Sequence, residues 1–171
     1  MRDFVNTLEV DDGTEHLADP KALADWLAER GLMRGRTADA GDLARARRLR
    51  EGLRALLLEN NGISVGKEAR AVLDRTARRA GLGVRFQPDG ASVEPTAGGV
   101  DGALGRLVAV AATAMLDGTW ARLKACRAPD CRWAFYDQAR NRSRTWCSMA
   151  VCGNRVKART YRRRHAARPR A

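Results

Sequence analysis

The sequence predicts an α+β fold that is mostly helical: a helical front domain with a short β-hairpin, then a small cysteine-containing module ending in a basic helix. Three observations predict it. Apolar residues recur at helical spacing as far as residue 80, alternation replaces that spacing near residues 84–94, and all four cysteines fall within residues 126–152 of the 171-residue chain. We therefore predict a domain of residues 1–118 and a module of residues 119–171.

Three helices are predicted before the hairpin. The first begins at Asp19-Pro20, where Asp19 can cap the helix and Pro20 fits its first position, and it ends at Gly31. The others span about residues 42–59 and 67–79. In the second helix an apolar stripe faces the core and arginines occupy the other face: Leu43, Ala46, Leu49, Leu53, Leu56 and Leu57 against Arg45, Arg47, Arg48, Arg50 and Arg54.

A hairpin and a fourth helix complete the predicted front domain. Residues 84–86 and 91–94 alternate on either side of a Pro-Asp-Gly turn. After a glycine-rich connection, a helix from about Ala103 to Met115 is apolar nearly all round, so we expect it at the centre of the domain. Its longest apolar run is ten residues, far short of the roughly 20 that span a bilayer. With no secretory signal apparent either, we expect a cytoplasmic protein with reduced thiols.

Positive charge is concentrated in the second part of the chain. The formal net charge is +12, from 32 Lys and Arg and 20 Asp and Glu. Residues 1–119 carry 17 basic and 18 acidic side chains, whereas residues 120–171 carry 15 basic and only two acidic ones. This asymmetry favours a polyanion as partner of the basic part and excludes a uniformly acidic, disordered solubiliser.

The cysteines Cys126, Cys131, Cys147 and Cys152 follow the pattern C-x4-C-x15-C-x4-C. Two close pairs joined by a loop are what a tetrahedral four-cysteine zinc site requires, in a treble-clef-like module. Four thiolates leave no open coordination position, so we expect one structural zinc ion. Two disulfides, an iron–sulfur cluster and four separate buried thiols are the alternatives.

A basic helix is predicted to start near Ser148. In that helix one face, which includes Cys152 and Val156, turns toward the metal, and a stripe of arginines at i, i+4 and i+7 can contact phosphates. The alternative is a solvated basic tail. Three aromatic residues near the cysteines can stack on bases, but a miniature core over the metal is the favoured interpretation: Trp133, Phe135 and Trp146.

Residues 133–159 resemble the CGNR-type zinc finger, whose name-giving run is Cys152-Gly153-Asn154-Arg155 here. The front part is similar to the ABATE domain, in residues 3–8 and in the later Leu-x-x-Trp-Leu and Gly-Leu pairs of residues 23–32. The resemblance implies a bacterial stress-induced transcription regulator whose finger binds DNA and whose four cysteines hold zinc. From the arginine stripe and the family motif together, the predicted nucleic-acid contacts are Arg144, Asn154, Arg155, Lys157, Arg159, Arg162 and Arg163.

The sequence therefore predicts a DNA-binding transcription regulator, associated with the nucleoid, rather than an enzyme. We find neither a phosphate-binding loop nor a dinucleotide fingerprint. The alternatives are an RNA-binding or ribosome-associated zinc protein and a zinc-stapled protein-interaction module. The front domain is expected to form a homodimer or to sense a small-molecule effector. Asn6 and Thr7 are expected to make a buried polar contact in that domain or to border a small-molecule pocket.

Overall fold

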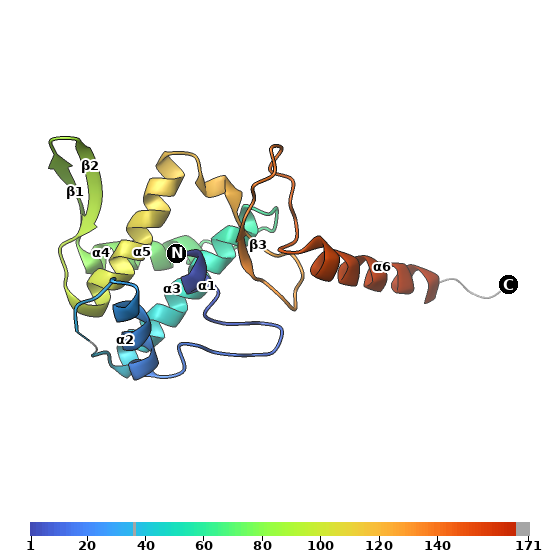
Figure 1. Cartoon of the computed structure of the whole chain (residues 1–171), viewed down its shortest axis with the longest axis horizontal. Helices are drawn as coiled ribbons and strands as arrows, with labels where there is room; N and C mark the ends of the chain where they lie inside the picture. Colours follow the sequence, from blue (N-terminus) through green and yellow to red (C-terminus); the bar gives the residue numbers. More distant parts are fainter. Residues whose placement is uncertain (36, 167–171) are drawn as a thin grey trace.

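The computed structural model describes residues 1–35 and 37–166, so the last five residues of the predicted module, 167–171, lie outside the described part. Four helices and a hairpin form the front domain, and a second, smaller hairpin and a long helix form the zinc module (Figure 1). The elements are, in order, α1 (Arg2–Val5), α2 (Pro20–Glu29), α3 (Ala40–Glu59), α4 (Glu68–Ala80), β1 (Leu82–Gln87), β2 (Gly90–Pro95), α5 (Gly99–Leu116), β3 (Leu123–Ala125), β4 (Ala134–Tyr136) and α6 (Asn154–Ala166).

The helix starts are set by aspartate caps. The carboxylate of Asp19 accepts a hydrogen bond from the backbone N–H of Ala22 (2.7 Å), as its position before Pro20 predicts. In α3, Asp39 and Asp42 form a reciprocal capping box, with bonds of 2.7 and 2.9 Å. The box moves the start of α3 two residues ahead of the predicted one.

Helix α5 is the centre of the front domain and packs against α3 and α4. It is long and apolar enough to cross a membrane by length and composition, but just over half of it is buried inside the protein, as in the core helix of a folded domain. It begins at Gly99, four residues before the predicted start. A Cβ atom at Gly102 would lie 2.2 Å from the Ala97 carbonyl oxygen, and one at Gly105 would lie 2.4 Å from the Ala80 Cβ. These glycines thus belong to the helix because its neighbours approach so closely.

The predicted hairpin is present as β1 and β2, paired antiparallel with Val84 opposite Val93. It projects from the body of the molecule (Figure 1). Val84 and Phe86 on β1 are exposed, the latter by 85%.

The prediction that all the arginines of α3 face solvent is wrong for two of them. Arg50 and Arg54 are 3% and 4% exposed. Arg50 forms a bidentate ion pair with Glu15, at 2.7 and 2.8 Å. Arg54 donates to the carbonyl oxygens of Val5 (2.7 Å) and Arg132 (3.1 Å). These partners satisfy both guanidinium groups, so α3 has a buried polar end beside its apolar stripe.

That polar end attaches the zinc module to the front domain. Asn60 and Asn61, at the end of α3, donate to carbonyl oxygens of the module, among them Leu123 (2.9 Å) and Ala125 (2.8 Å). Ala125 and Ala134 are buried in the same apolar cluster as the front domain. The two parts therefore share one continuous core where they meet.

Candidate metal centre and basic helix

The four cysteines predicted as metal ligands lie together. Their Sγ atoms are all within 4.8 Å of one another, and the Cys131–Cys147 and Cys147–Cys152 separations are both 3.6 Å. A tetrahedral ion with Zn–S bonds of about 2.3 Å separates its sulfurs by roughly 3.8 Å, whereas a disulfide needs about 2.05 Å. All four are free thiols. The donor set fits one zinc ion with a closed coordination shell.

The first pair sits on a knuckle at the tip of the β3–β4 hairpin. The backbone N–H of Cys126 donates to the Trp133 carbonyl (2.9 Å), and that of Cys131 donates to Ala128 (3.0 Å). Arg132 follows in the left-handed region, with φ of 55°. The tight turn directs both sulfurs to the same side of the hairpin. Sequence alternation indicated β4 through Trp133 and Phe135, but the three-residue strand β3 was not predicted.

Without a metal, protons are shared unequally among these thiols. A hydrogen bond from Cys131 lowers the pKa of Cys126 to about 5, and backbone N–H groups lower it further. The same contact raises the pKa of Cys131, and burial raises that of Cys147 to about 12. A divalent cation therefore has to displace protons to bind all four sulfurs, so zinc affinity falls as pH falls.

The second pair opens the last helix through a π-helical turn, Met149–Gly153, which runs into α6. The Ser148 carbonyl accepts from the backbone N–H of both Cys152 (3.0 Å) and Gly153 (3.1 Å). The turn buries the Cys152 side chain among the other ligands. Such π-turns are frequent at functional sites, and this one starts close to the predicted residue, Ser148.

The name-giving residues of the motif all serve the module itself. A Cβ atom at Gly153 would lie 2.4 Å from the Met149 sulfur, so only glycine fits there. The Asn154 amide donates to the Ala150 carbonyl (3.2 Å). Arg155 Nη2 lies 3.5 Å from the Cys152 sulfur. In this structure these side chains therefore stabilise the metal-bearing turn.

Arg155 and Arg159, two residues of the predicted nucleic-acid stripe, both pair with Asp130 of the knuckle. The Asp130 Oδ2 atom lies 3.4 Å from Arg155 Nη1 and 2.8 Å from Arg159 Nη2. The bond from Arg159 lowers the pKa of Asp130. Sequence analysis missed this contact, which joins the first cysteine pair to α6 across the metal site.

The other predicted contacts differ in their surroundings. Arg144 is held by the module, since its Cζ atom lies 5.1 Å from the centre of the Phe135 ring and its Nη2 donates to the Cys147 carbonyl (2.5 Å). Lys157, Arg162 and Arg163 are exposed on α6. Of these three, only Arg162 makes a hydrogen bond among the described residues, to the carbonyl of its own helix at Ala158 (3.4 Å).

The aromatic residues near the cysteines divide between two environments. Phe135 is buried beside the ligands, and Trp146 and Val156 pack against the same cluster, which is the predicted miniature core. Trp133 is 36% exposed and faces away from that core, toward the front domain.

An ion pair that sequence analysis did not predict supports the long loop between the cysteine pairs. Lys124 is 5% exposed and Asp137 is fully buried. Lys124 Nζ lies 2.8 Å from Asp137 Oδ2, and the same carboxylate accepts from the backbone N–H groups of Ala139 and Arg144, both at 3.0 Å. Burial alone would raise the pKa of Asp137, but these bonds lower it. A signal was present, because Asp130 and Asp137 are the only acidic residues after residue 119.

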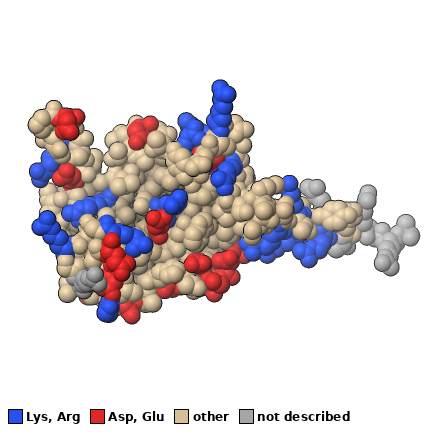
Figure 2. Space-filling model, viewed as in Figure 1, with Lys and Arg blue, Asp and Glu red and all other residues tan. Residues whose placement is uncertain are grey.

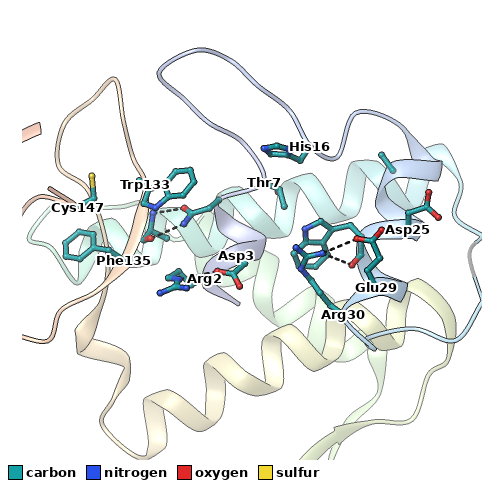
Figure 3. Close-up of a pocket in the computed structure, with 14 residues that line it drawn as sticks. Arg2, Asp3, Thr7, His16, Asp25, Glu29, Arg30, Trp133, Phe135 and Cys147 are labelled. Carbon is teal, nitrogen blue, oxygen red and sulfur yellow. Dashed lines mark hydrogen bonds and ion pairs between the residues drawn. The ribbon is translucent and has the colours of Figure 1, made fainter. Parts of the chain in front are cut away.

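Asn6 and Thr7 border a cavity of about 630 Å³ between the front domain and the zinc module (Figure 3). Asn6 makes the predicted buried polar contact, although its partner is the backbone of Ala134 in the zinc module rather than the front domain. Trp26 of α2 and Trp133 of the knuckle line the cavity from its two sides.

A closed four-cysteine centre on a knuckle and a helix start, attached to a helical domain, defines a structural-zinc protein whose last helix is strongly basic. Residues 122–165 match the model of the CGNR zinc finger. Residues 2–119 match the ABATE model, described as a "Putative stress-induced transcription regulator". The chain belongs to the ABATE family and ends in a CGNR zinc finger. A comparison with curated proteins finds no match.

Proposed function

We propose that this protein regulates transcription by binding duplex DNA through α6, with zinc holding that helix in place. The supporting observation is the placement of α6. The helix extends away from the body of the molecule and carries blue basic groups along its surface (Figures 1 and 2). Residues 154–166 contain six Lys and Arg and no Asp or Glu. A helix of one charge sign that makes few contacts with its own protein is suited to lie against a polyphosphate.

Zinc acts structurally in this proposal. The metal joins the knuckle to the first turn of α6, and the module has a small apolar core of its own, so much of its folding free energy comes from metal binding. When bound, the ion supplies this cross-link and no reaction. We propose a binding protein rather than an enzyme, located in the cytoplasm at the nucleoid.

The test is a salt-titrated DNA-binding measurement on protein shown by metal analysis to hold one zinc per chain. If α6 engages about six phosphates, affinity should fall roughly thousandfold between 50 and 200 mM salt. Arg162→Ala/Arg163→Ala should weaken binding and flatten the salt slope by about two phosphates' worth. The matched control is Arg70→Ala/Arg85→Ala, which removes the same charge from arginines paired with Glu59 and Glu94 in the front domain.

Two other outcomes separate the alternatives. Preferential binding of structured RNA in direct competition with duplex DNA assigns the helix to RNA. A salt slope near zero for both nucleic acids rejects the proposal and leaves an acidic protein as the partner of α6. The predicted homodimer, for which the exposed Val84 and Phe86 of the hairpin are a candidate contact, is tested by sedimentation of the same zinc-loaded samples.

A further inference from the structure

A second cavity, of about 540 Å³, lies where α3, α4 and α5 meet, remote in sequence from the zinc module. Five arginines border it: Arg45, Arg48, Arg75, Arg78 and Arg79. Asp101 is the only carboxylate among its lining residues. This concentration of positive charge occurs in a domain whose basic and acidic residues are otherwise nearly balanced.

Asp101 holds two of the arginines in place. Its two oxygens each lie 2.8 Å from Arg79 Nε, and its Oδ1 lies 3.4 Å from Arg45 Nε. Arg45 also pairs with Asp42 of the α3 capping box. The Arg45 Nε atom is buried and makes no hydrogen bond among the described residues. Two guanidinium groups are thus already oriented at the cavity, and one has a donor without an acceptor.

The remaining three arginines are exposed, and none makes a hydrogen bond or ion pair with another described residue: Arg48, Arg75 and Arg78. Arg75 is three residues from Arg78 and four from Arg79 on α4, so these like charges are neighbours on one helix face. Neighbouring like charges oppose folding unless an anion sits between them. Arginine forks bind phosphate oxygens in bidentate fashion, which a cluster of this kind allows.

We propose that this cavity binds a small phosphorylated metabolite that carries at least two adjacent phosphate groups. The phosphates lie among the arginine side chains, and the apolar part of the ligand contacts Val72 and Leu104, which also line the cavity. A concave site of this volume fits a small molecule, whereas a duplex needs a long exposed surface such as α6. The site is distinct from the DNA-binding helix, and its occupancy is measurable without DNA.

Isothermal titration of the zinc-loaded full chain with ATP, with inorganic pyrophosphate and with adenosine tests the proposal. At least one of the two anions should bind with one site per chain, and adenosine should bind far more weakly. Arg75→Ala/Arg78→Ala should weaken that binding by about tenfold or more, because each lost charge-assisted bond is worth about a factor of ten. Both side chains are exposed, so the fold should remain intact, which circular dichroism checks.

The matched control is again Arg70→Ala/Arg85→Ala, which removes two positive charges from the same domain outside the cavity. It should retain the wild-type affinity for the anion. The proposal is overturned if neither anion binds, if adenosine binds as tightly as ATP, or if both double variants lose affinity equally. Loss of duplex DNA binding in Arg75→Ala/Arg78→Ala, without any anion binding in the wild type, would instead assign these arginines to DNA.

Discussion

The side chain of Asn6 pairs with the backbone of Ala134 as a neighbouring strand would. Asn6 Nδ2 donates to the Ala134 carbonyl (3.0 Å), and Asn6 Oδ1 accepts from the Ala134 N–H (2.7 Å). The two residues are 128 positions apart and both are buried. One amide side chain in the first helical turn thus completes the free edge of β4 and joins the front domain to the zinc module.

Asn6→Asp should destabilise the zinc-loaded protein by about 2 kcal/mol, because a carboxylate can accept from the Ala134 N–H but cannot donate to its carbonyl, so two buried acceptors face each other. Urea unfolding with tryptophan fluorescence measures this loss. Asn141→Asp is the control: the exposed Asn141 uses only its oxygen, toward Ser143, and the substitution preserves that acceptor. Equal stability of the two variants would contradict the role of Asn6.

The buried ion pair of the module gives a second prediction. Lys124→Met should cost about 3 kcal/mol or more of unfolding free energy, because it leaves the fully buried Asp137 carboxylate without a cation. Adding Asp137→Asn to that variant should recover part of the loss, since the new side chain is neutral and keeps an acceptor for the backbone N–H groups. Lys67→Met, at an exposed lysine, is the control, and denaturant unfolding is the measurement.

The metal site was predictable from the sequence because its determinants are local. Each cysteine pair is brought together by one short turn, so the spacing alone identified all four ligands. The helices were predictable for the same reason, through caps such as Asp19. The glycines of α5 were misinterpreted as a connection, since the close neighbours that require them, Ala80 and Ala97, lie elsewhere in the fold.

Polar partners were not predictable, because they come from distant segments. Helical periodicity assigns Arg54 to a face but cannot show that the Arg132 carbonyl, 78 residues away, lies within reach. The same holds for Asp130 and the arginines of α6, 29 residues from Arg159 in sequence. The side chains expected to contact DNA were assigned by charge and helical phase alone, and their intramolecular partners depend on tertiary structure.

The Glu15–Arg50 pair predicts a specific pH dependence. Burial by itself raises the pKa of Glu15, but bonds from Arg50 and from the Leu17 N–H outweigh it and hold that pKa below its ordinary value of 4.5. A group with a depressed pKa in the folded state stabilises the protein above its unfolded pKa, and this stabilisation is lost as pH falls through the folded pKa. Glu15→Gln should therefore cost about 2 kcal/mol near neutral pH and progressively less below about pH 4.5.

Comparison of two proteins at each pH isolates this effect. Acid also releases zinc, but it does so in the wild type and in Glu15→Gln alike, so the difference in unfolding free energy reports on Glu15. Glu29→Gln, at an exposed glutamate, should show no pH-dependent difference of this kind. A gap between wild type and Glu15→Gln that stays constant from neutral to acidic pH would exclude the pair as its source.

Asp130 limits the charge that α6 offers to a polyanion. It pairs with Arg155 and Arg159, and its carboxylate places a negative charge beside the helix that we propose binds DNA. Because these pairs are partly exposed, separating them costs at most about 1 kcal/mol. Asp130→Asn should retain one zinc per chain and bind duplex DNA about two- to fivefold more tightly at 50 mM salt, with the gain shrinking as salt screens it.

The control for Asp130→Asn is Asp89→Asn, which changes the net charge equally at the turn of the projecting hairpin. Its effect on affinity should be smaller, because exposed charges beyond about 10 Å are largely screened at 0.1 M salt. If Asp130→Asn instead weakens DNA binding while zinc content is unchanged, Asp130 orients α6 for binding rather than competing with phosphate. An unchanged affinity would mean that neither Arg155 nor Arg159 meets the DNA, leaving Lys157, Arg162 and Arg163 as the contacts to test.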